Sequence, residues 1–212
     1  MTNILLADDH PVIRTGLKIF INKVVNTSNI DEVWECAAAY RKISDNQYSL
    51  IILDATIAGE DAYTLVQKIL LLKPAANILM FSVNNEEIYA KKYFQLGVKG
   101  YLSKDATEPE IELAIENVLN NKRYISASLV KVLTDDALGL TPHNPFDDLS
   151  QREFQIVGYL LRGASAAEIG NRLSIHSSTI GTHKARILEK LKCKNIVDIN
   201  LLGQMFKIIP AE

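Results

Sequence analysis

The sequence predicts a protein in two parts: an α/β doubly wound five-stranded parallel sheet, followed by an all-α four-helix domain with a helix-turn-helix. In the first 120 or so residues, five short apolar runs alternate with helical patterns, which is typical of a parallel sheet covered by helices. A segment rich in glycine and proline follows. Beyond it, helix-capping sequences open apolar segments with helical spacing.

The strands are expected at residues 3–7, 30–36, 50–53, 77–81 and 98–102. Each is a short, nearly continuous apolar run, as expected for strands buried on both faces. The helices between and after them are expected at residues 12–22, 37–43, 62–72, 86–96 and 108–119. Pro11 suits the first turn of a helix, and Gly97 suits a helix C-terminus.

Polar side chains follow four of these strands at the points where the strands end. In chain order they are Asp8 and Asp9, Asp54, Ser82, and Lys104. Because the carboxyl ends of parallel strands share one sheet edge, we expect these residues to converge on one pocket. Three carboxylates repel one another unless a cation is present, and an oxygen-only ligand set suits Mg²⁺. Together with the lysine and the hydroxyl, this pattern favours phosphoryl transfer to Asp54.

The same residues, with Tyr101 in the string GYLSKDA, resemble the receiver domain of two-component response regulators over residues 3–119. The resemblance implies a flavodoxin- or CheY-like fold in which Asp54 accepts a phosphoryl group from a sensor histidine kinase. It implies that Asp9, Asp54 and the main-chain carbonyl of Thr56 hold Mg²⁺, with Asp8 assisting through water. It further implies that Lys104 pairs with the phosphoryl oxygens while Ser82 and Tyr101 rearrange in response.

The segment after the acceptor, ATIAGEDA, differs from the Met-Pro-Gly run usual in that family, and Val83 replaces a small residue. Two alternatives therefore stay open. One is a regulator that works without phosphorylation and uses the receiver for protein interaction or dimerisation. The other is a phosphohydrolase with an aspartate nucleophile, which needs a second acid two residues later, where this sequence has Thr56.

The expected domains are residues 1–124, a linker at 125–147 with a short helix at 126–138, and a second domain at 148–212. The string GLTPHNPFDD has linker composition. Capping boxes begin at Ser150 and Ser165, and they predict helices through Leu161 and Leu173. Further helices are expected at 179–191 and 197–206. A short helix, a tight turn and a longer helix form a helix-turn-helix, whose second helix enters the DNA major groove.

The 149–191 segment resembles the LuxR-type helix-turn-helix, and the whole chain resembles response regulators of the NarL/FixJ-like family. The expected partner is double-stranded promoter DNA, with RNA as the disfavoured alternative. Gly181 stands where the family usually has a basic residue, so we expect weaker or altered DNA recognition. The candidate DNA contacts are Ser178, Thr179, Thr182, His183, Lys184, Arg186 and Lys190.

Charge and composition narrow the class of protein. Residues 1–124 carry 13 Lys and Arg against 16 Asp and Glu, whereas residues 149–212 carry nine against five. The basic excess of the second domain suits nucleic acid but is small, so we expect a homodimer in the active state. The last helix, at 197–206, is the candidate dimer face, and the alternative is that its apolar residues complete the core. Two distant cysteines form no metal-ligand pattern. Without a signal peptide or a membrane-length apolar run, we expect a cytoplasmic regulator that is not an enzyme.

Overall fold

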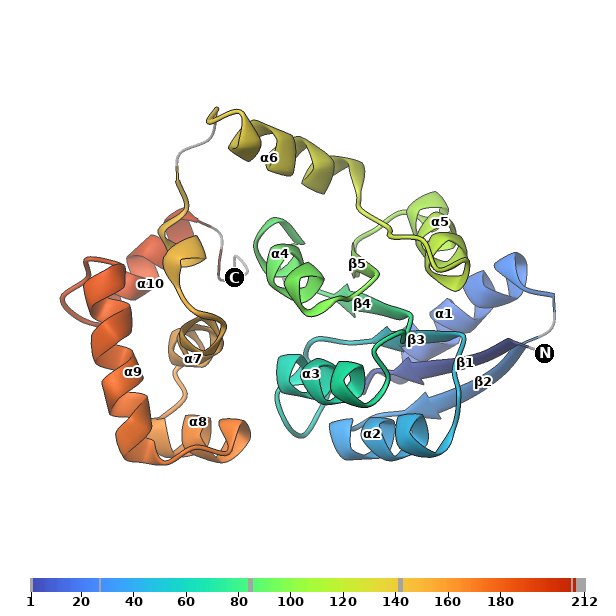
Figure 1. The fold of residues 1–212 in the computed structure, drawn as a ribbon, viewed down its shortest axis with the longest axis horizontal. Coiled ribbons are helices and arrows are strands. Elements are labelled where there is room, and N and C mark those ends of the chain that lie inside the picture. Colours follow the sequence, from blue (N-terminus) through green and yellow to red (C-terminus); the bar gives the residue numbers. More distant parts are fainter. Residues whose placement is uncertain (1, 27, 84–85, 141–142, 207, 209–212) are drawn as a thin grey trace. The chain divides into compact units, whose positions relative to one another are not determined.

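The computed structural model describes residues 2–26, 28–83, 86–140, 143–206 and 208 (Figure 1). It consists of two compact units, Met1–Lys131 and Val132–Glu212. The first unit contains a parallel sheet covered by helices, and the second is helical. The predicted fold class is therefore confirmed.

The sheet of the first unit has the strand order β2-β1-β3-β4-β5, and every pairing is parallel. The chain crosses from one side of β1 to the other, between β2 and β3, which places the carboxyl ends of β1 and β3 next to each other. In such sheets, this point of reversal is where ligands bind. The strands are β1 (Thr2–Ala7), β2 (Ser28–Val33), β3 (Leu50–Leu53), β4 (Ile78–Ser82) and β5 (Gly100–Ser103).

Five helices cover the sheet. Helices α1 and α5 bury one apolar face, where Leu17 and Ile115 pack into a cluster with Ile4 and Ile52 of the strands. Each fully buried aliphatic side chain of this kind contributes about 1.5–3 kcal/mol relative to an exposed one. Helix α3 contacts both α2 and α4. The bounds are α1 (Pro11–Val24), α2 (Cys36–Asp45), α3 (Ala62–Leu72), α4 (Glu86–Leu96) and α5 (Glu108–Leu119).

Most strand bounds differ from the prediction by one to three residues, and two of the differences arise because backbone N–H groups bond elsewhere. The second strand was expected to reach Cys36, but it ends at Val33. Cys36 begins α2 instead, and its N–H donates to the carbonyl of Ala58 at 2.9 Å. The fifth strand was expected from Val98, whose N–H instead donates to Tyr93 of α4 at 3.3 Å.

Helix α6 (Ala127–Ala137) follows the sheet domain close to its predicted bounds of 126–138. The residues leading into it belong to the first unit. Tyr124 is buried in the core cluster, and Leu129 is fully buried. The division between the two units lies inside α6, after Lys131. The predicted linker bounds of 125 and 147 stay a prediction.

Beyond α6, the second unit contains a short 3-10 helix, η1 (Pro145–Asp148), which overlaps the end of the expected linker. The reason is Phe146, which is fully buried and lies 6.3 Å from the Phe206 ring. Pro142, counted in the same linker, lies outside the described residues. The remaining helices are α7 (Gln151–Leu161), α8 (Ala166–Leu173), α9 (Ser177–Lys190) and α10 (Ile196–Met205).

Both predicted capping boxes are present in this unit. The hydroxyl of Ser150 accepts from the Glu153 N–H at 3.3 Å, and the Glu153 carboxylate accepts from the Ser150 N–H at 2.8 Å. Ser165 and Glu168 repeat the arrangement at the start of α8. The caps fix where α7 and α8 begin, and thereby where the helix-turn-helix lies in the chain.

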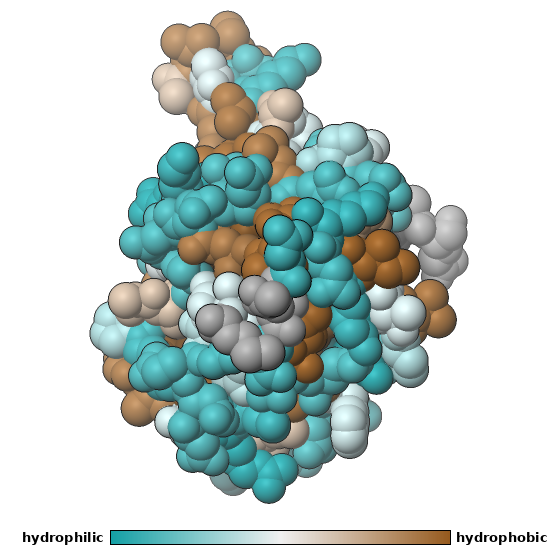
Figure 2. Space-filling view, turned by 90° about the vertical axis from the view of Figure 1, so that its right-hand side faces the viewer, coloured by the Kyte–Doolittle hydropathy of each residue, from teal (hydrophilic) through white to brown (hydrophobic). Residues whose placement is uncertain are grey.

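A hollow of about 790 Å³ lies at the amino ends of the strands, between the end of α1 and α5. Figure 2 looks toward this end of the sheet and shows hydrophobic residues among hydrophilic ones. The hollow lies at the opposite end of the strands from the predicted pocket, which is at their carboxyl ends. Across the part of the chain that the structure describes, no helix has the length and apolar character needed to cross a membrane.

Candidate functional site

Three carboxylates meet just beyond the carboxyl ends of β1 and β3. Asp8 and Asp54 are buried, with exposures of 2% and 1%, whereas Asp9 is exposed. Oxygens of these three residues and a ring nitrogen of His10 all lie within 4.8 Å of one another. The structure thus brings together acids that are far apart in sequence, at the sheet edge where we expected them.

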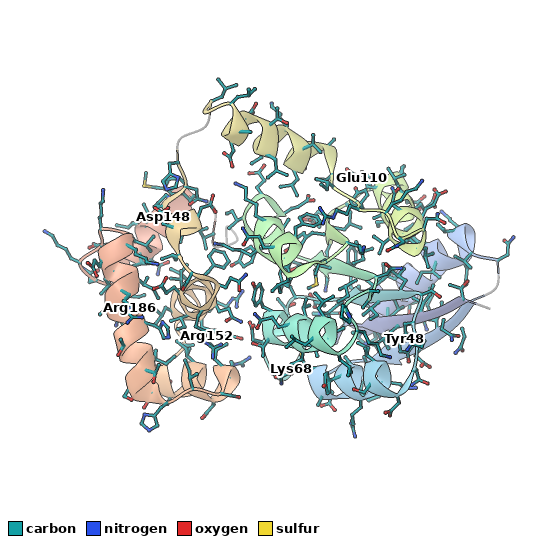
Figure 3. All side chains as sticks on the ribbon, in the orientation of Figure 1. Tyr48, Lys68, Glu110, Asp148, Arg152 and Arg186 are labelled. Carbon is teal, nitrogen blue, oxygen red and sulfur yellow. The ribbon has the colours of Figure 1, made fainter. Side chains whose placement is uncertain are left out.

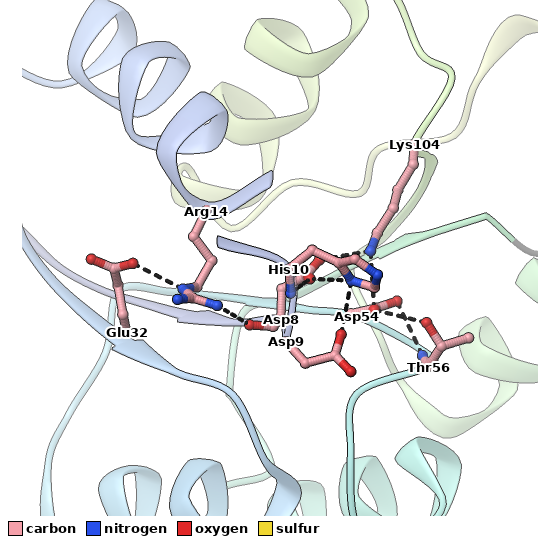
Figure 4. A network of polar contacts seen from close by, with 8 residues as sticks. All are labelled: Asp8, Asp9, His10, Arg14, Glu32, Asp54, Thr56 and Lys104. Carbon is pink, nitrogen blue, oxygen red and sulfur yellow. Dashed lines mark hydrogen bonds and ion pairs between the residues drawn. The ribbon is translucent and has the colours of Figure 1, made fainter. Parts of the chain in front are cut away.

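Lys104 closes this pocket from the end of β5. Its Nζ lies 2.7 Å from Asp8 Oδ2 and 3.0 Å from Asp54 Oδ2, and its side chain is only 7% exposed (Figure 4). Burial lowers the pKa of Lys104, but the hydrogen bonds and charges of Asp8 and Asp54 outweigh it and raise the pKa above its ordinary value. Lys104 therefore stays protonated and is the cation of the pocket.

The loop after β3 bonds back to the Asp54 carboxylate. The Thr56 N–H donates to Asp54 Oδ1 at 3.0 Å, and the Thr56 hydroxyl donates to Oδ2 at 2.8 Å. With Lys104 also on Oδ2, both carboxylate oxygens have donors. A charged carboxylate with several donors has a fixed orientation, which is what a positioned nucleophile requires.

His10 is a member of the pocket that the sequence analysis missed. Its Nδ1 lies 2.8 Å from Asp9 Oδ1 and 3.1 Å from Asp8 Oδ1 (Figure 4). Its backbone N–H also donates to Asp8 Oδ1, at 2.8 Å. The signal was present in the sequence, because His10 directly follows the two aspartates.

Ser82 and Tyr101 are both fully buried, at the end of β4 and within β5. Burial raises the pKa of the Tyr101 hydroxyl, and its hydrogen bond with Ser82 opposes this effect. The Tyr101 ring lies 5.8 Å from that of Tyr93, which in turn lies 5.5 Å from Tyr63. Tyr101 therefore occupies an inward position within a row of aromatic rings.

The unusual segment ATIAGEDA is anchored to the start of α2. Ala58 pairs with Glu35 in a parallel bridge, and the Cys36 thiol donates to the carbonyl of Glu60 at 3.2 Å. Gly59 has φ +108°, a conformation that other residues rarely adopt. Burial raises the pKa of Cys36 to about 12, so this thiol is an uncharged packing group. Val83, the other departure, is 54% exposed and is not packed into the pocket.

The donor set fits Mg²⁺. Asp8, Asp9 and Asp54 outnumber Lys104 as charges, so a cation relieves the excess negative charge at this edge. Carboxylate oxygens are the ligands that Mg²⁺ prefers, and it retains several waters at sites with few protein ligands. The nearby His10 ring is already directed at two of the carboxylates.

The helix-turn-helix of the second unit depends on close approach of α8 to the following turn. A Cβ atom at Gly170 would lie 2.7 Å from the Ile175 carbonyl oxygen, so only glycine fits there without a shift. The Ile175 N–H donates to the Gly170 carbonyl at 2.9 Å, and Ser174 adopts a left-handed conformation with φ 54°. The tight turn that was predicted from the sequence is thus present.

Helix α9 carries all the candidate DNA contacts. His176 caps it by accepting a hydrogen bond from the Ser178 N–H, so the helix begins at Ser177, two residues before the predicted start. Arg186 extends from its exposed face (Figure 3), and Gly181 has open space around the position of a Cβ. Ser178, Thr179, Thr182 and Arg186 are exposed, whereas His183 and Lys184 are half-buried.

Lys190 is a candidate DNA contact whose side chain bonds to a different helix, α7. Its Nζ lies 2.7 Å from Glu153 Oε2 and donates to the Asp148 carbonyl at 3.2 Å. Glu153 is the buried capping residue of α7, so Lys190 ties the end of α9 to the start of α7. Arg152, labelled on α7 in Figure 3, similarly donates to the Leu173 carbonyl at 2.7 Å.

Helix α10 presents an apolar stripe to solvent. Val197, Leu201 and Met205 are 62%, 57% and 77% exposed, and their spacing of four residues places them on one helix face. Ile199 and Gly203, on the opposite face, are buried. The core of the unit is thus completed without the stripe.

Comparisons with known proteins agree with this architecture. Residues 4–116 match the response regulator receiver domain, and residues 147–202 match the luxR family of bacterial regulatory proteins. The oxygen regulatory protein NreC of Staphylococcus carnosus is 28% identical over 199 residues, which cover 91% of this chain and 92% of NreC. The response regulator UvrY of Escherichia coli is 26% identical over 213 residues, covering 100% of this chain and 98% of UvrY.

Among solved structures, RcsB from Salmonella enterica serovar Typhimurium, bound to promoter rprA in the presence of phosphomimetic BeF3-, has a similar fold. The TM-score is 0.75 with 19% sequence identity, and the match covers 96% of this chain and 99% of RcsB. A second RcsB structure gives a TM-score of 0.78 at 21% identity and covers 98% of each chain.

Proposed function

The chain belongs to the response regulator receiver family and carries a second domain of the luxR family, and on this premise we propose that phosphorylation of Asp54 controls its binding to promoter DNA. The observation that carries the proposal is the meeting of Asp8, Asp54 and Lys104 within ion-pair distance at the carboxyl edge of the sheet. This arrangement supplies a fixed nucleophile together with a cation beside it.

In the proposed reaction, an Asp54 carboxylate oxygen forms a bond to the phosphorus of a phosphohistidine on a sensor histidine kinase. The phosphorus–nitrogen bond breaks, and its electron pair returns to the histidine ring. Lys104, whose Nζ lies 3.0 Å from Asp54 Oδ2, then pairs with the negatively charged phosphoryl oxygens. Mg²⁺, held by Asp8, Asp9, Asp54 and the Thr56 carbonyl, would neutralise charge on the same phosphoryl group.

We propose Ser82 and Tyr101 as the residues that report the phosphoryl group to the rest of the receiver. Both are fully buried, and they are joined by a hydrogen bond. If the Ser82 hydroxyl turns to the phosphoryl oxygens, Tyr101 loses its partner and repacks against Tyr93. A change at Asp54 thereby reaches the surface beside β5.

Output is proposed to occur through residues 148–212, with α9 in the major groove of double-stranded DNA and α10 joining two copies of the chain. The basic excess of this region gives few phosphate contacts per copy, so two copies on a paired site bind better than one. Structures of RcsB include a complex with promoter DNA and two dimers bound to two parallel DNAs. The exposed stripe of α10 is the proposed contact between copies.

The proposed location follows from the proposed partner. A protein that binds promoter DNA and receives a phosphoryl group from a kinase works in the cytoplasm of a bacterial cell. Its own phosphorylation is the one reaction proposed for it.

The test is to incubate the full chain with Mg²⁺ and a small-molecule phosphodonor, and to measure its intact mass. The proposal predicts a gain of one phosphoryl group, lost in Asp54→Ala and retained in Asp45→Ala, which removes a different carboxylate at the end of α2. A gain that persists in Asp54→Ala would assign another acceptor. No gain, with DNA binding intact, would favour the phosphorylation-independent regulator.

A further inference from the structure

Arg14 lies next to the acidic pocket and bonds to the main chain of Asp8, not to the carboxylates of the pocket. Its side chain, on α1, is 13% exposed. Nη1 donates to the main-chain carbonyl of Asp8 at 2.7 Å, and Nε donates to Glu32 Oε2 at 2.9 Å (Figure 4). The guanidinium thus joins α1 and β2 to the residue where the chain leaves β1 and enters the pocket.

The Asp8 peptide groups are held from two directions. In the sheet, Ala7 pairs with Val33, and the Asp8 N–H donates to the Val33 carbonyl at 3.1 Å. The Asp8 carbonyl has already left the ladder, and Arg14 is its partner. Without the guanidinium, the carbonyl of the buried Asp8 loses its donor, and the turn is free to rotate.

Rotation at this point would move a proposed metal ligand. The Asp8 carbonyl and the Asp9 N–H belong to one planar peptide group, so the direction of the carbonyl fixes the plane from which Asp9 continues. Asp9 is exposed and its carboxylate is contacted by His10, itself in the same turn. Arg14 therefore constrains Asp9 from outside the turn.

Glu32 keeps Arg14 in place. It accepts from Arg14 and also from Lys18, one turn further along α1. The hydrogen bond from Lys18 lowers the pKa of the Glu32 carboxyl, burial opposes this effect, and the bond from Arg14 lowers the pKa further. Glu32 is thus a charged partner that holds Arg14. Two different nitrogens of the guanidinium bond to Glu32 and to the Asp8 carbonyl at the same time, which a single lysine ammonium group does not reproduce.

We propose that Arg14, anchored by Glu32, is a positioning residue for the Mg²⁺ site: it fixes the Asp8–Asp9 peptide and so preorganises the carboxylates for the cation. The inference rests on the proposed function for the identity of the cation. Arg14 and Glu32 are not among the proposed ligands of the metal or the phosphoryl group, and they act through the main chain of Asp8. Outer partners of metal ligands typically account for 10–100-fold in metal affinity.

The test is a calorimetric titration of Mg²⁺ into the full chain and into Arg14→Met, which keeps the apolar stem and removes the guanidinium. We expect the Kd for Mg²⁺ to rise about tenfold. Lys18→Met is the matched control, because it removes the other cation on Glu32 and leaves the Asp8 carbonyl bonded. It should change the Kd by less than about twofold. The Kd of Arg14→Lys for Mg²⁺ should lie between those of Arg14→Met and Lys18→Met.

Circular dichroism and thermal unfolding accompany each titration. A purely structural role would lower the unfolding temperature of Arg14→Met while leaving its Mg²⁺ Kd equal to that of the unmutated chain, and this result would overturn the inference. An unmutated chain that binds no Mg²⁺ would overturn it as well. If Arg14→Met does not fold, Arg14→Lys and Glu32→Gln decide by the same comparison.

The mass measurement separates this inference from the proposed function. A tenfold difference in Mg²⁺ Kd without phosphorylation of Asp54 would sustain the positioning role and remove phosphoryl transfer. Phosphorylation of the unmutated chain with equal Mg²⁺ affinity in Arg14→Met would do the reverse.

Discussion

The acidic pocket gathers side chains from the ends of β1, β3 and β5, whereas the candidate DNA contacts lie along one helix, α9. In the pocket, Asp8 and Asp54 are buried, and both pair with Lys104, whose side chain is 7% exposed. On α9, Thr182 and Arg186 are exposed. The pocket therefore depends on where each atom is held, and the helix surface depends on which charges it presents.

The two regions should fail differently when they are changed. Removing a partner in the pocket leaves a buried charge without compensation, which costs stability as well as function. Removing an exposed charge of α9 such as that of Arg186 leaves the fold intact and changes only the interaction with DNA. The predictions below use this contrast.

The largest effect is expected for Lys104→Met. Without its cation, the pocket holds two buried carboxylates, and the free energy of unfolding in the absence of Mg²⁺ should fall by about 3 kcal/mol. Trp34 is the only tryptophan of the chain and lies in the first unit, so its fluorescence during urea unfolding reports on this unit. Added Mg²⁺ should restore part of the loss.

Lys122→Met, which removes an exposed lysine, is the control for lost charge.

The contribution of Lys104 to stability depends on pH. Because the pKa of Lys104 in the folded protein lies above 10.5, this stabilisation is complete below the ordinary lysine pKa. It is lost as the pH rises through the folded value. The difference between the unmutated chain and Lys104→Met should hold at neutral pH and shrink in strong base. An equal loss in Lys122→Met would refute the assignment.

The next effect concerns two glycines of the helical unit. Gly170→Ala places a methyl group 2.7 Å from the Ile175 carbonyl oxygen, and overpacking of this kind costs about 1–3 kcal/mol. Gly181→Ala meets open space within α9 and should add up to ~1 kcal/mol of helix stability. Thermal unfolding followed by circular dichroism measures both variants, and effects of the same sign would contradict the structure.

A weaker effect is expected at the apolar stripe of α10. Leu201→Glu should lower affinity for a paired DNA site about tenfold, which corresponds to about 1.4 kcal/mol, and should leave binding to a half-site unchanged. Gln47→Glu adds the same charge at an exposed position of the first unit, outside α10. Fluorescence anisotropy measures the affinity of each variant for the paired-site duplex and for the half-site duplex. Equal losses on both duplexes would show that α10 does not join two copies.

The smallest effect is expected for Arg186→Met. The logarithmic dependence of DNA affinity on salt should become shallower by about 0.9 for each phosphate contact removed. Stability should not change, because Arg186 is exposed. Lys122→Met, in the other unit, lowers the net charge equally and should leave the slope as it is. An identical change in slope would mean that only total charge matters. Gly181→Lys sharpens the test, because we expect it to strengthen DNA binding.

Three helices were predicted to the residue because local chemistry decides where they begin and end. The bounds of α3, α4 and α5 match the prediction, with Asp61 capping α3. The end of β2 was predicted poorly because it depends on the bridge between Glu35 and Ala58, which joins segments far apart in sequence.

The candidate site shows the same division. Asp8, Asp54 and Lys104 were predicted because each follows an apolar strand, and parallel strands end at one edge. Arg14 and Glu32 were missed because their pairing depends on how α1 lies against β2, and nothing in their spacing of 18 residues indicates it. The ion pair of Lys190 with Glu153 was missed for the same reason, and the role of Lys190 at DNA stays a prediction.

The central claim is that the phosphoryl group on Asp54 controls DNA binding. The direct measurement is the affinity of the full chain for a paired site, with and without a small-molecule phosphodonor and Mg²⁺, beside Asp54→Asn under both conditions. We expect tighter binding only for the phosphorylated, unmutated chain. Equal affinity in all four samples, with phosphorylation confirmed by mass, would contradict the claim.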